Sequence, residues 1–243
     1  MKIVISQPMY FPWVGHLELL KAADIYVFYD DVAFSKGSFT NRVQLIHNNV
    51  QKWLSVPLPK HSNKKNICEV YPSTETEWRG SNLATFKMAY KDAPFYDDAL
   101  ELVNEVLTAD VNSIEPLSAL AEMSTRVLAR YLGIDTSTRF LRSSELDIPG
   151  SGSDRVLEVC KHLNASEYIT AHGASNYLDH ENFEREGVAV KYLSYSLKPY
   201  QQLSSDFIPY VSGLDLIANL GGESMGFLTT QCTDWRDFIA SKD

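Results

Sequence analysis

The stretch from Ile3 to Arg42 limits the possible fold more than any other part of this sequence. Residues 3–5 form a short apolar run that is typical of a buried strand. A loop with two prolines follows, and the apolar residues from Leu17 to Ala23 suit the buried side of a helix. A second apolar run, residues 25–29, ends at Asp30 and Asp31. This order predicts a strand–helix–strand unit with parallel strands, whose loops lie at the sheet edge where ligands bind.

The composition excludes several classes of protein. The chain has 243 residues and a net charge of −9, from 22 basic and 31 acidic residues. That balance disfavours duplex nucleic acid as a partner, because phosphate binding needs a basic face. Cys68, Cys160 and Cys232 form neither a disulfide framework nor a metal-binding motif, and no histidine pair has the i, i+4 spacing of a zinc site. No apolar run approaches a membrane span of about 18 residues, so we expect a cytoplasmic protein without membrane insertion.

The remainder of the chain predicts a helical segment followed by a second α/β half. Residues 43–57 read as a hairpin, residues 67–71 as a strand, and residues 80–132 as helices, the last of which has a plausible start at Ser113 with Pro116. The second half reads as strands and helices in the order 139–141, 154–163, 167–170, 176–186, 188–192 and 214–220, with Ser153 or Asp154 as the cap of the 154–163 helix. We therefore predict a single α/β domain over residues 1–243, with a mostly parallel central sheet, flanking helices and a helical insertion at about 80–132.

The start of the first helix contains a possible phosphate site. Gly15 and His16 open this helix directly after the first strand. The arrangement resembles the nucleotidyltransferases, in which a His-x-Gly-His signature and the helix start meet the phosphates of a nucleotide. Here Trp13 stands where the first histidine would be. The alternatives at this point are a nucleotide site and a histidine that only caps the helix.

Charged residues after the second strand form another candidate site. A carboxylate at the carboxyl end of a parallel strand often binds a metal, a ribose or an amine, although it can also cap the next turn. Adjacent side chains on a strand point to opposite faces, so we expect only one of Asp30 and Asp31 in the site. Lys36, Asn41 and Arg42 follow closely, and Arg42 suits bidentate recognition of a carboxylate or phosphate. The alternative for Arg42 is an ion pair with either aspartate.

The loop of residues 170–175 follows a strand of the second half and carries His172, Gly173 and Ser175. His172 is suited to acid–base work near neutral pH, and Gly173 allows close approach of a ligand to the backbone. Because each candidate lies just beyond a predicted strand, we expect one pocket at the carboxyl edge of the sheet. Its predicted lining is Gln7, Tyr10, Trp13, one of Asp30 and Asp31, Arg42 and His172.

Three further motifs indicate a family. The first is Gln7-Pro8-x-Tyr10-x-Pro12-Trp13-x-Gly15. The second is Asp30-Asp31-Val32-x-Phe34-Ser35-Lys36 followed by Ser38-Phe39-x-Asn41-Arg42, and the third is Trp53-Leu54-x-Val56-Pro57. Later matches are Tyr177-Leu178-Asp179, Tyr200-x-Gln202, Phe207, Leu214-Asp215-Leu216 and Asn219-x-Gly221. With these motifs the chain resembles the WbqC-like family nearly end to end, although the position after Gly15 is commonly tyrosine there and is His16 here.

The resemblance implies a bacterial protein of surface polysaccharide biosynthesis, often of the O-antigen of lipopolysaccharide. Such systems decorate amino sugars, so the leading hypothesis is transfer of an acyl or aminoacyl group from an activated donor to the amino sugar of a nucleotide-linked sugar. The alternatives are a nucleotidyltransferase acting on a sugar phosphate and a non-catalytic sugar-binding or assembly subunit. The sequence names no cofactor and no metal. The candidate catalytic residues are Asp30, Asp31 and His172, and the candidate substrate-binding residues are Gln7, Tyr10, Trp13, Gly15, His16, Lys36, Asn41, Arg42, Gly173, Ser175, Tyr200 and Gln202.

Overall fold

The computed structural model describes residues 1–108, 115–195 and 198–242. Within these ranges the central sheet has six strands in the order β5-β2-β1-β6-β7-β8. All neighbouring pairs are parallel except β7 and β8. The strands are β1 (Lys2–Ser6), β2 (Ile25–Phe28), β5 (Arg139–Arg142), β6 (Glu167–Thr170), β7 (Ala189–Leu193) and β8 (Cys232–Asp234). The predicted mostly parallel sheet is therefore confirmed, including the parallel pairing of β1 with β2 that the first unit requires.

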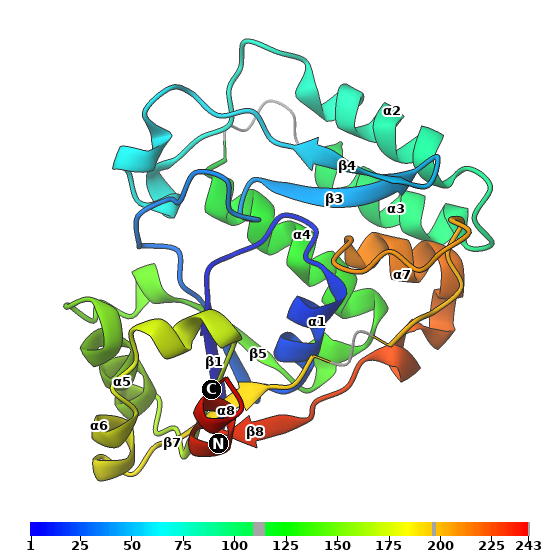
Figure 1. Cartoon of the computed structure of the whole chain (residues 1–243). Coiled ribbons are helices and arrows are strands. Elements are labelled where there is room, and N and C mark those ends of the chain that lie inside the picture. Colours follow the sequence, from blue (N-terminus) through cyan, green and yellow to red (C-terminus); the bar gives the residue numbers. More distant parts are fainter. Residues whose placement is uncertain (109–114, 196–197, 243) are drawn as a thin grey trace.

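Helices cover both faces of this sheet (Figure 1). Val4, Tyr26 and Phe28 point into one hydrophobic cluster, and Ile3, Ile5 and Val27 point into the other. The alternation along β1 and β2 thus places buried side chains on both faces, as in a parallel sheet between two helical layers. On the first face lie α1 (Val14–Lys21) and α4 (Leu117–Tyr131), with α7 (Gly213–Leu220) packed on α1, α3 (Tyr96–Leu107) on α4 and α7, and α2 (Trp78–Tyr90) on α3. On the second lie α5 (Gly152–His162), α6 (His180–Arg185) and α8 (Trp235–Ala240).

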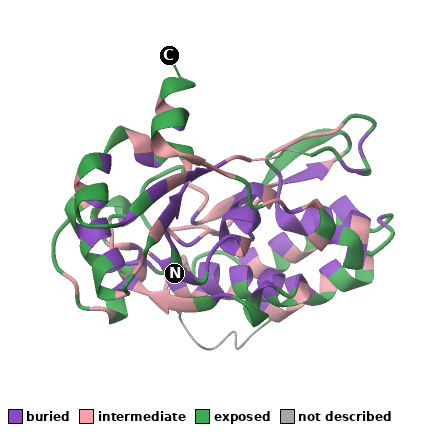
Figure 2. Ribbon diagram, turned by 90° about the horizontal axis from the view of Figure 1, so that it is seen from below, coloured by how far each residue is buried: buried purple, intermediate pink, exposed green. Residues whose placement is uncertain are grey.

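Helices α2, α3 and α4 form the predicted helical lobe. Their apolar sides belong to the same buried cluster as the first face of the sheet, through residues such as Phe86, Val103 and Leu128. Figure 2 shows buried residues along the strands and on the inner sides of these helices. Helix α4 begins at Leu117 after Pro116, whereas Ser113 lies outside the described residues.

Residues 29–75 connect β2 to the helical lobe and contain a separate hairpin. Its strands are β3 (Arg42–His47) and β4 (Val50–Ser55), which pair antiparallel. The turn residues Asn48 and Asn49 have φ values of 52° and 61°, which asparagine tolerates better than most residues. The strand expected at 67–71 is wrong, because Ile67–Glu69 is a 3₁₀ turn whose capping box joins Asn66 and Glu69. The other 3₁₀ turns are Ser62–Lys64, Ile134–Thr136, Ser143–Glu145, His172–Asn176 and Gly221–Phe227.

A buried carboxyl joins the helical lobe to the C-terminal part of the chain. Asp215 on α7 is fully buried and accepts hydrogen bonds from the Tyr90 hydroxyl at 2.9 Å, the Tyr200 hydroxyl at 2.7 Å and the Gln202 side-chain amide at 2.9 Å. Burial raises the pKa of this carboxyl despite the three donors. Tyr200 and Gln202 therefore have a clear structural role.

We expect the Asp215→Ala variant to lose about 3 kcal/mol of unfolding free energy, because three buried donors would lose their acceptor. Chemical denaturation at neutral pH measures this loss. Asp206→Ala, at an exposed position of the neighbouring loop, is the matched control and should change stability by less than about 0.5 kcal/mol. A loss at position 215 as small as the control would contradict the role of this network.

The pH dependence of stability should also differ between the wild type and Asp215→Asn. The folded-state pKa of Asp215 is raised, so the folded protein holds this proton more tightly than the unfolded chain. The protonated Asp215 carboxyl therefore stabilises the folded state. This contribution is fully present below the unfolded pKa of about 4 and is lost as the pH rises from there through the folded-state pKa. We therefore expect wild-type stability, relative to Asp215→Asn, to fall as the pH is raised from about 3.5.

Candidate functional site

A cleft of about 660 Å³ opens at the carboxyl ends of β1, β2 and β6, on the α5 side of the sheet. Gln7 follows β1, Asp31 follows β2, and Gly173 follows β6. The start of α5 closes the opposite side. The lining is made of Ile5, Ser6, Gln7, Met9, Tyr29, Asp31, Val32, Ala33, Gly150, Ser151, Gly152, Arg155, Val156, Thr170, Ala171, Gly173, Ala174 and Tyr177.

The strand order explains why the cleft lies here. From β1 the chain crosses to β2 on one side, whereas β6 pairs with the other edge of β1 and continues to β7. The loops after β1 and β6 therefore leave the sheet in opposite directions and open a crevice between them. Ligands of open parallel sheets bind at such a switch point, outside the carboxyl ends of the strands.

The start of α5 is the first polar feature of the cleft. Gly150 and Gly152 have φ values of 106° and 57°, which favour glycine. Helix α5 begins at Gly152 with Ser151 in the N-cap position, and no side chain of the described residues caps it, so the expected cap by Ser153 or Asp154 is wrong. Backbone N–H groups at such an uncapped start can bind an anion.

An ion pair between Asp31 and Arg155 is the second polar feature. The Arg155 guanidinium donates to Asp31 Oδ2 at 2.5 Å and to the Ile148 carbonyl at 2.9 Å, and it lies 5.1 Å from the Tyr29 ring centroid. The Ser143 hydroxyl donates to the other Asp31 oxygen at 2.6 Å. Partial burial alone would raise the pKa of Asp31, but the hydrogen bonds from Arg155 and Ser143 lower it below its usual value. Asp31 is therefore an ionised carboxylate at neutral pH.

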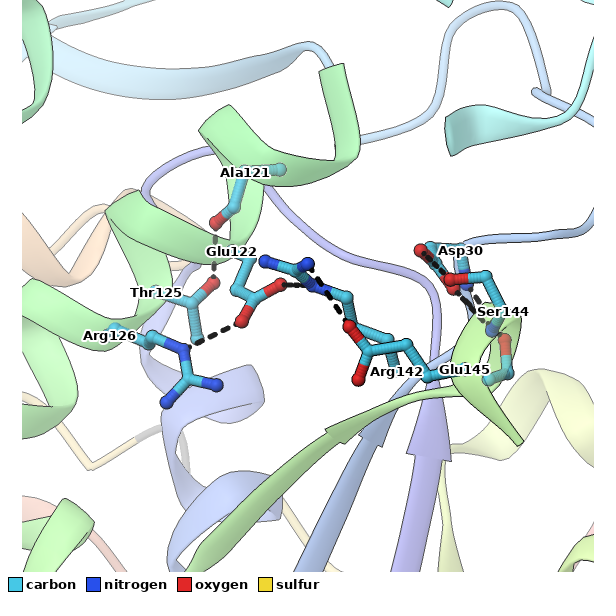
Figure 3. Close-up of polar contacts among 9 residues, drawn as sticks. Asp30, Ala121, Glu122, Thr125, Arg126, Arg142, Ser144 and Glu145 are labelled. Atoms are coloured by element: carbon cyan, nitrogen blue, oxygen red, sulfur yellow. Dashed lines mark hydrogen bonds and ion pairs between the residues drawn. The ribbon is translucent and has the colours of Figure 1, made fainter. Parts of the chain in front are cut away.

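Asp30 points to the other face of the sheet and is only 2% exposed. It accepts hydrogen bonds from the backbone N–H of Ser144 at 3.0 Å and from the Ser144 hydroxyl at 2.8 Å. The Ser143 hydroxyl lies within 3.2 Å of the same carboxyl. Figure 3 shows Asp30 turned toward Ser144. Asp30 thus joins the ends of β2 and β5, and only Asp31 lines the cleft, as the alternation of side chains predicts.

A second set of charges in Figure 3 joins α4 to β5. The buried Glu122 carboxylate pairs with Arg126 at 2.7 Å and with Arg142 at 2.5 Å. Arg126 also lies 4.6 Å from the Phe140 ring centroid, and Arg142 contacts Glu145 at 3.3 Å. This network holds the helical lobe against the edge strand and contributes no residue to the cleft lining.

Aromatic hydroxyls line the β2 and β6 sides of the cleft. Tyr29 and Tyr177 both face it, and burial raises the pKa of each phenol. Thr170 lies beside them and is joined to the Tyr168 hydroxyl at 3.2 Å. These groups offer neutral hydrogen bonds and ring faces, which are what a sugar or a base requires.

Comparison with known proteins now adds to this geometry. The model of the WbqC-like protein family matches residues 7–226. The chain belongs to the WbqC-like protein family. It is 25% identical over 228 residues to the "Uncharacterized protein Rv1507c" of Mycobacterium tuberculosis, which covers 93% of this chain and 97% of that protein. No solved structure matches.

The family motifs divide between the cleft and other parts of the fold. Gln7 of the first motif and Asp31 of the second line the cleft, together with Gly173. The expected lining of Gln7, Tyr10, Trp13, one of Asp30 and Asp31, Arg42 and His172 is confirmed for Gln7 and Asp31 and wrong for the other four, which lie outside this cleft. The candidates outside the cleft lining are Tyr10, Trp13, Gly15, His16, Asp30, Lys36, Asn41, Arg42, His172, Ser175, Tyr200 and Gln202.

Tyr10 and His16 are buried in the core on the α1 side. Tyr10 is fully buried and its hydroxyl accepts from Asn82 at 3.2 Å. His16 is 3% exposed, and its Nε2 forms a 2.7 Å hydrogen bond with the hydroxyl of Tyr26. Burial lowers the pKa of His16 to about 4. The imidazole is therefore neutral at physiological pH and faces a phenol rather than the cleft.

Trp13 and Gly15 line a separate cavity on the α1 side, which we call the aromatic recess. Its lining is Trp13, Val14, Gly15, Glu18, Lys198, Tyr200, Phe207, Ile208, Pro209, Tyr210, Val211 and Phe227. A Cβ atom at Gly15 would lie 2.2 Å from the Trp13 ring and 2.7 Å from Tyr195. Glycine is thus required for these rings to pack over the start of α1.

The later residues of the second motif position the hairpin. The Asn41 side chain donates to the Val56 carbonyl at 2.9 Å. Arg42 lies 4.1 Å from the Trp53 ring centroid and donates to the Gly37 carbonyl at 2.6 Å. It forms no ion pair with Asp30 or Asp31 in the described structure, so that alternative is wrong. Lys36 is exposed in the same loop.

His172 lies between the cleft-lining residues Ala171 and Gly173 but does not itself line the cleft. Its Nε2 donates to the Leu193 carbonyl at 2.9 Å, which leaves Nδ1 as the acceptor nitrogen. Its ring contacts Tyr195 and Phe238 at centroid distances of 4.9 and 4.8 Å. The Ser175 hydroxyl donates to the His172 carbonyl, which fixes the turn and leaves Ser175 outside the cleft.

Arg155, Tyr29 and the start of α5 line the cleft but were not among the candidate residues predicted from the sequence. The signal for the α5 start was present in the glycine-rich run of residues 149–153 before a helix. Arg155 is a single arginine on an amphipathic helix, and its partner Asp31 is distant in sequence. Among the described residues, no group of three or more histidine, cysteine or acidic side chains is arranged to hold a metal ion, and no described helix has the length and apolar character to cross a membrane.

We expect Arg155→Met to lower the unfolding free energy by roughly 2 kcal/mol at pH 7, because it leaves Asp31 ionised without its partner. The folded-state pKa of Asp31 is lowered, so the stability from this pair is present above the unfolded pKa of about 4 and is lost below it. The difference between wild type and variant should therefore shrink as the pH falls from 5 to 2.5.

Denaturation curves across that pH range, with Arg185→Met as the control, check this prediction. Arg185 is exposed on α6 and bonds only the neighbouring Asn182 within the described structure. A difference between wild type and Arg155→Met that is independent of pH would contradict the proposed coupling to Asp31.

Proposed function

We propose that this protein is a transferase of bacterial surface polysaccharide (O-antigen) biosynthesis, which adds an acyl or aminoacyl group to the amino sugar of a nucleotide-linked sugar. The observation that carries the proposal is the cleft at the switch point of the sheet. It brings together an uncapped helix start, an ionised carboxylate and two tyrosines. Membership of the WbqC-like protein family supports the polysaccharide context.

The diphosphate of the nucleotide sugar would bind at the start of α5. The backbone N–H groups of residues 152–154 and the helix dipole favour an anion there. The Arg155 guanidinium, one turn into the helix, adds a positive charge. A backbone site of this kind suits a protein whose net charge is −9, because it needs few basic side chains.

The sugar would extend toward β2 and β6. Tyr29, Tyr177 and Gln7 offer hydrogen bonds to its hydroxyl groups, and the tyrosine rings offer apolar faces. Asp31 would hold the amino group through a charge-assisted hydrogen bond. Because the pKa of Asp31 is lowered, we assign this carboxylate to orienting the amine rather than to removing its proton.

The transfer step would form a bond between the amine nitrogen and the acyl carbon, and break the bond from that carbon to its thiol or alcohol leaving group. One proton leaves the amine, and one proton is needed by the leaving group. His172 lies outside the cleft lining but next to Gly173, and we propose that it carries this proton, with Nδ1 as the acceptor nitrogen of its neutral imidazole. This role requires the acyl donor to approach from the Gly173 side of the cleft.

The nucleotidyltransferase alternative receives less support. It assigns the phosphates to the start of α1, where His16 is instead buried and bonded to Tyr26. The strand–helix–strand start of the fold is the feature that still favours it. An assay of products separates this alternative, since it predicts pyrophosphate release from a sugar phosphate and a nucleoside triphosphate.

The decisive experiment incubates the purified protein with nucleotide-linked amino sugars and one of three donors: acyl-coenzyme A, aminoacyl-tRNA, or ATP with a free acid. We expect mass spectrometry to show the mass of one added acyl group on the sugar nucleotide. Tight binding of a nucleotide sugar without product under every donor would indicate a binding subunit and contradict the transferase.

Replacement of Asp31 by Asn should lower the transfer rate by about 10²-fold, because the amine loses its orienting charge. Asp92→Asn makes the same chemical change at an exposed position between α2 and α3, and we expect it to retain the wild-type rate. Circular dichroism and thermal unfolding of both variants verify that they are folded. Equal rates for the two variants would remove Asp31 from the mechanism.

A further inference from the structure

The aromatic recess is built from rings that belong to three separate segments of the chain. Trp13 comes from the loop before α1, Tyr200, Phe207 and Tyr210 from the loop before α7, and Phe227 from the 3₁₀ turn after it. Trp13 and Tyr210 lie 5.4 Å apart between ring centroids. Tyr200 meets Phe207 at 5.3 Å and Phe227 at 6.1 Å, edge to face in both cases.

The backbone on either side of these rings is strained. Phe11 and Tyr210 have φ values of 43° and 63°, a region that bulky residues rarely adopt. The two loops are joined because Ser212 Oγ donates to the Phe11 carbonyl at 2.9 Å and the Gly213 N–H donates to the Pro12 carbonyl at 2.8 Å. Strain of this kind concentrates at ligand sites. Here it lies beside Trp13 and at Tyr210, two residues that line the recess.

One ammonium group already lies on the wall of the recess. Lys198 Nζ is 4.3 Å from the centroid of the Phe227 ring. No carboxylate of the described residues pairs with it. With Lys198 in this position, the free volume is only about 20 Å³, which is room for about one water molecule. The buried Glu18 carboxyl, 1% exposed, also lines the recess, and its Oε1 accepts hydrogen bonds from the Thr229 N–H at 3.0 Å and the Thr229 hydroxyl at 3.1 Å.

We propose that the aromatic recess is a binding site for a substituted ammonium headgroup, and that the Lys198 ammonium occupies it when no ligand is bound. The negative faces of several aromatic rings attract a cation, and quaternary ammonium groups are recognised in cages of this type. The Glu18 carboxyl in the same lining complements the positive charge of such a headgroup. This inference goes beyond the proposed transferase and does not depend on it, because the recess and the cleft share no lining residue.

The test compares choline with its neutral isostere 3,3-dimethylbutan-1-ol, in which carbon replaces the charged nitrogen. Binding to the full-length protein is measured by isothermal titration calorimetry and by saturation-transfer NMR. In Lys198→Met, which keeps the length of the side chain but removes its charge, choline should bind about tenfold more tightly than in the wild type. The reason is that an internal occupant lowers the apparent affinity in proportion to the fraction of molecules whose recess is free, and a free fraction of about one in ten corresponds to a tenfold effect. The isostere should bind at least tenfold more weakly than choline.

Two further variants test whether the aromatic ring of Tyr210 and the specific lysine at position 198 matter for choline binding. Tyr210→Asn removes one ring at an exposed position whose backbone conformation asparagine tolerates. Introduced into Lys198→Met, it should weaken choline binding by about fivefold. Lys91→Met, at an exposed lysine distant from the recess lining, should leave choline affinity at the wild-type value. Equal binding of choline and the isostere, or an affinity unchanged by Lys198→Met, would overturn the proposal.

Discussion

The parallel pairing of β1 with β6 determines where the cleft lies in this fold. The register joins Lys2 to Glu167 and Val4 to Ile169, so two segments far apart in the chain meet at the centre of the sheet. The β1 loop departs over one face and the β6 loop over the other. The β1–β6 pair and the β1–β2 pair together bring the start of α5, Asp31, Tyr29 and Tyr177 to one edge of the sheet. Without the β1–β6 pairing, these residues would lie in separate loops and would not line one cleft.

The two faces of the sheet divide the polar residues into different roles. On the α1 face, Asp30, His16, Glu122 and Asp215 are buried and have partners that join helices and strands. On the α5 face, Asp31 keeps one side toward the cleft. The two adjacent aspartates, which follow β2 and share the Ser143 hydroxyl, therefore differ in their exposure to the cleft. The structural carboxylates hold the sheet edge and the helical lobe in place while the cleft residues remain accessible.

The fold could be predicted largely from the periodicity of the sequence. Residues 3–5 and 25–29 carry a strand pattern on both sides of a helical pattern, and this predicted the parallel β1–β2 pair. The helix predicted at 154–163 is present as α5, which begins two residues earlier at Gly152. By contrast, residues 67–71 are as apolar as a strand, but the capping box of Asn66 and Glu69 ends them in a 3₁₀ turn. Local hydrogen bonds of this kind override a short apolar run.

The candidate site could be predicted only in part, because a sequence motif does not show which of its side chains line a cleft and which are buried in the core. Gln7, Asp31 and Gly173 follow strand ends and line the cleft. Tyr10 and His16 lie in the same motif and are buried. Arg155 was missed because its significance depends on Asp31, 124 positions away. Pairings of that sequence separation carry no local signal, and only the topology brings them together.

The edges of the central sheet have a consequence for the behaviour of the protein at high concentration. Edge strand β5 has only four residues, with Arg139 and Arg142 at its ends, and β8 at the other edge has only three. An exposed strand edge can recruit a strand from another molecule, and short, charged edges prevent this. The apolar interior strands β1 and β2, which would otherwise be the most adhesive segments of the sequence, are shielded on both sides by their neighbours. Resistance to fibrillar association is therefore built into the order of the strands.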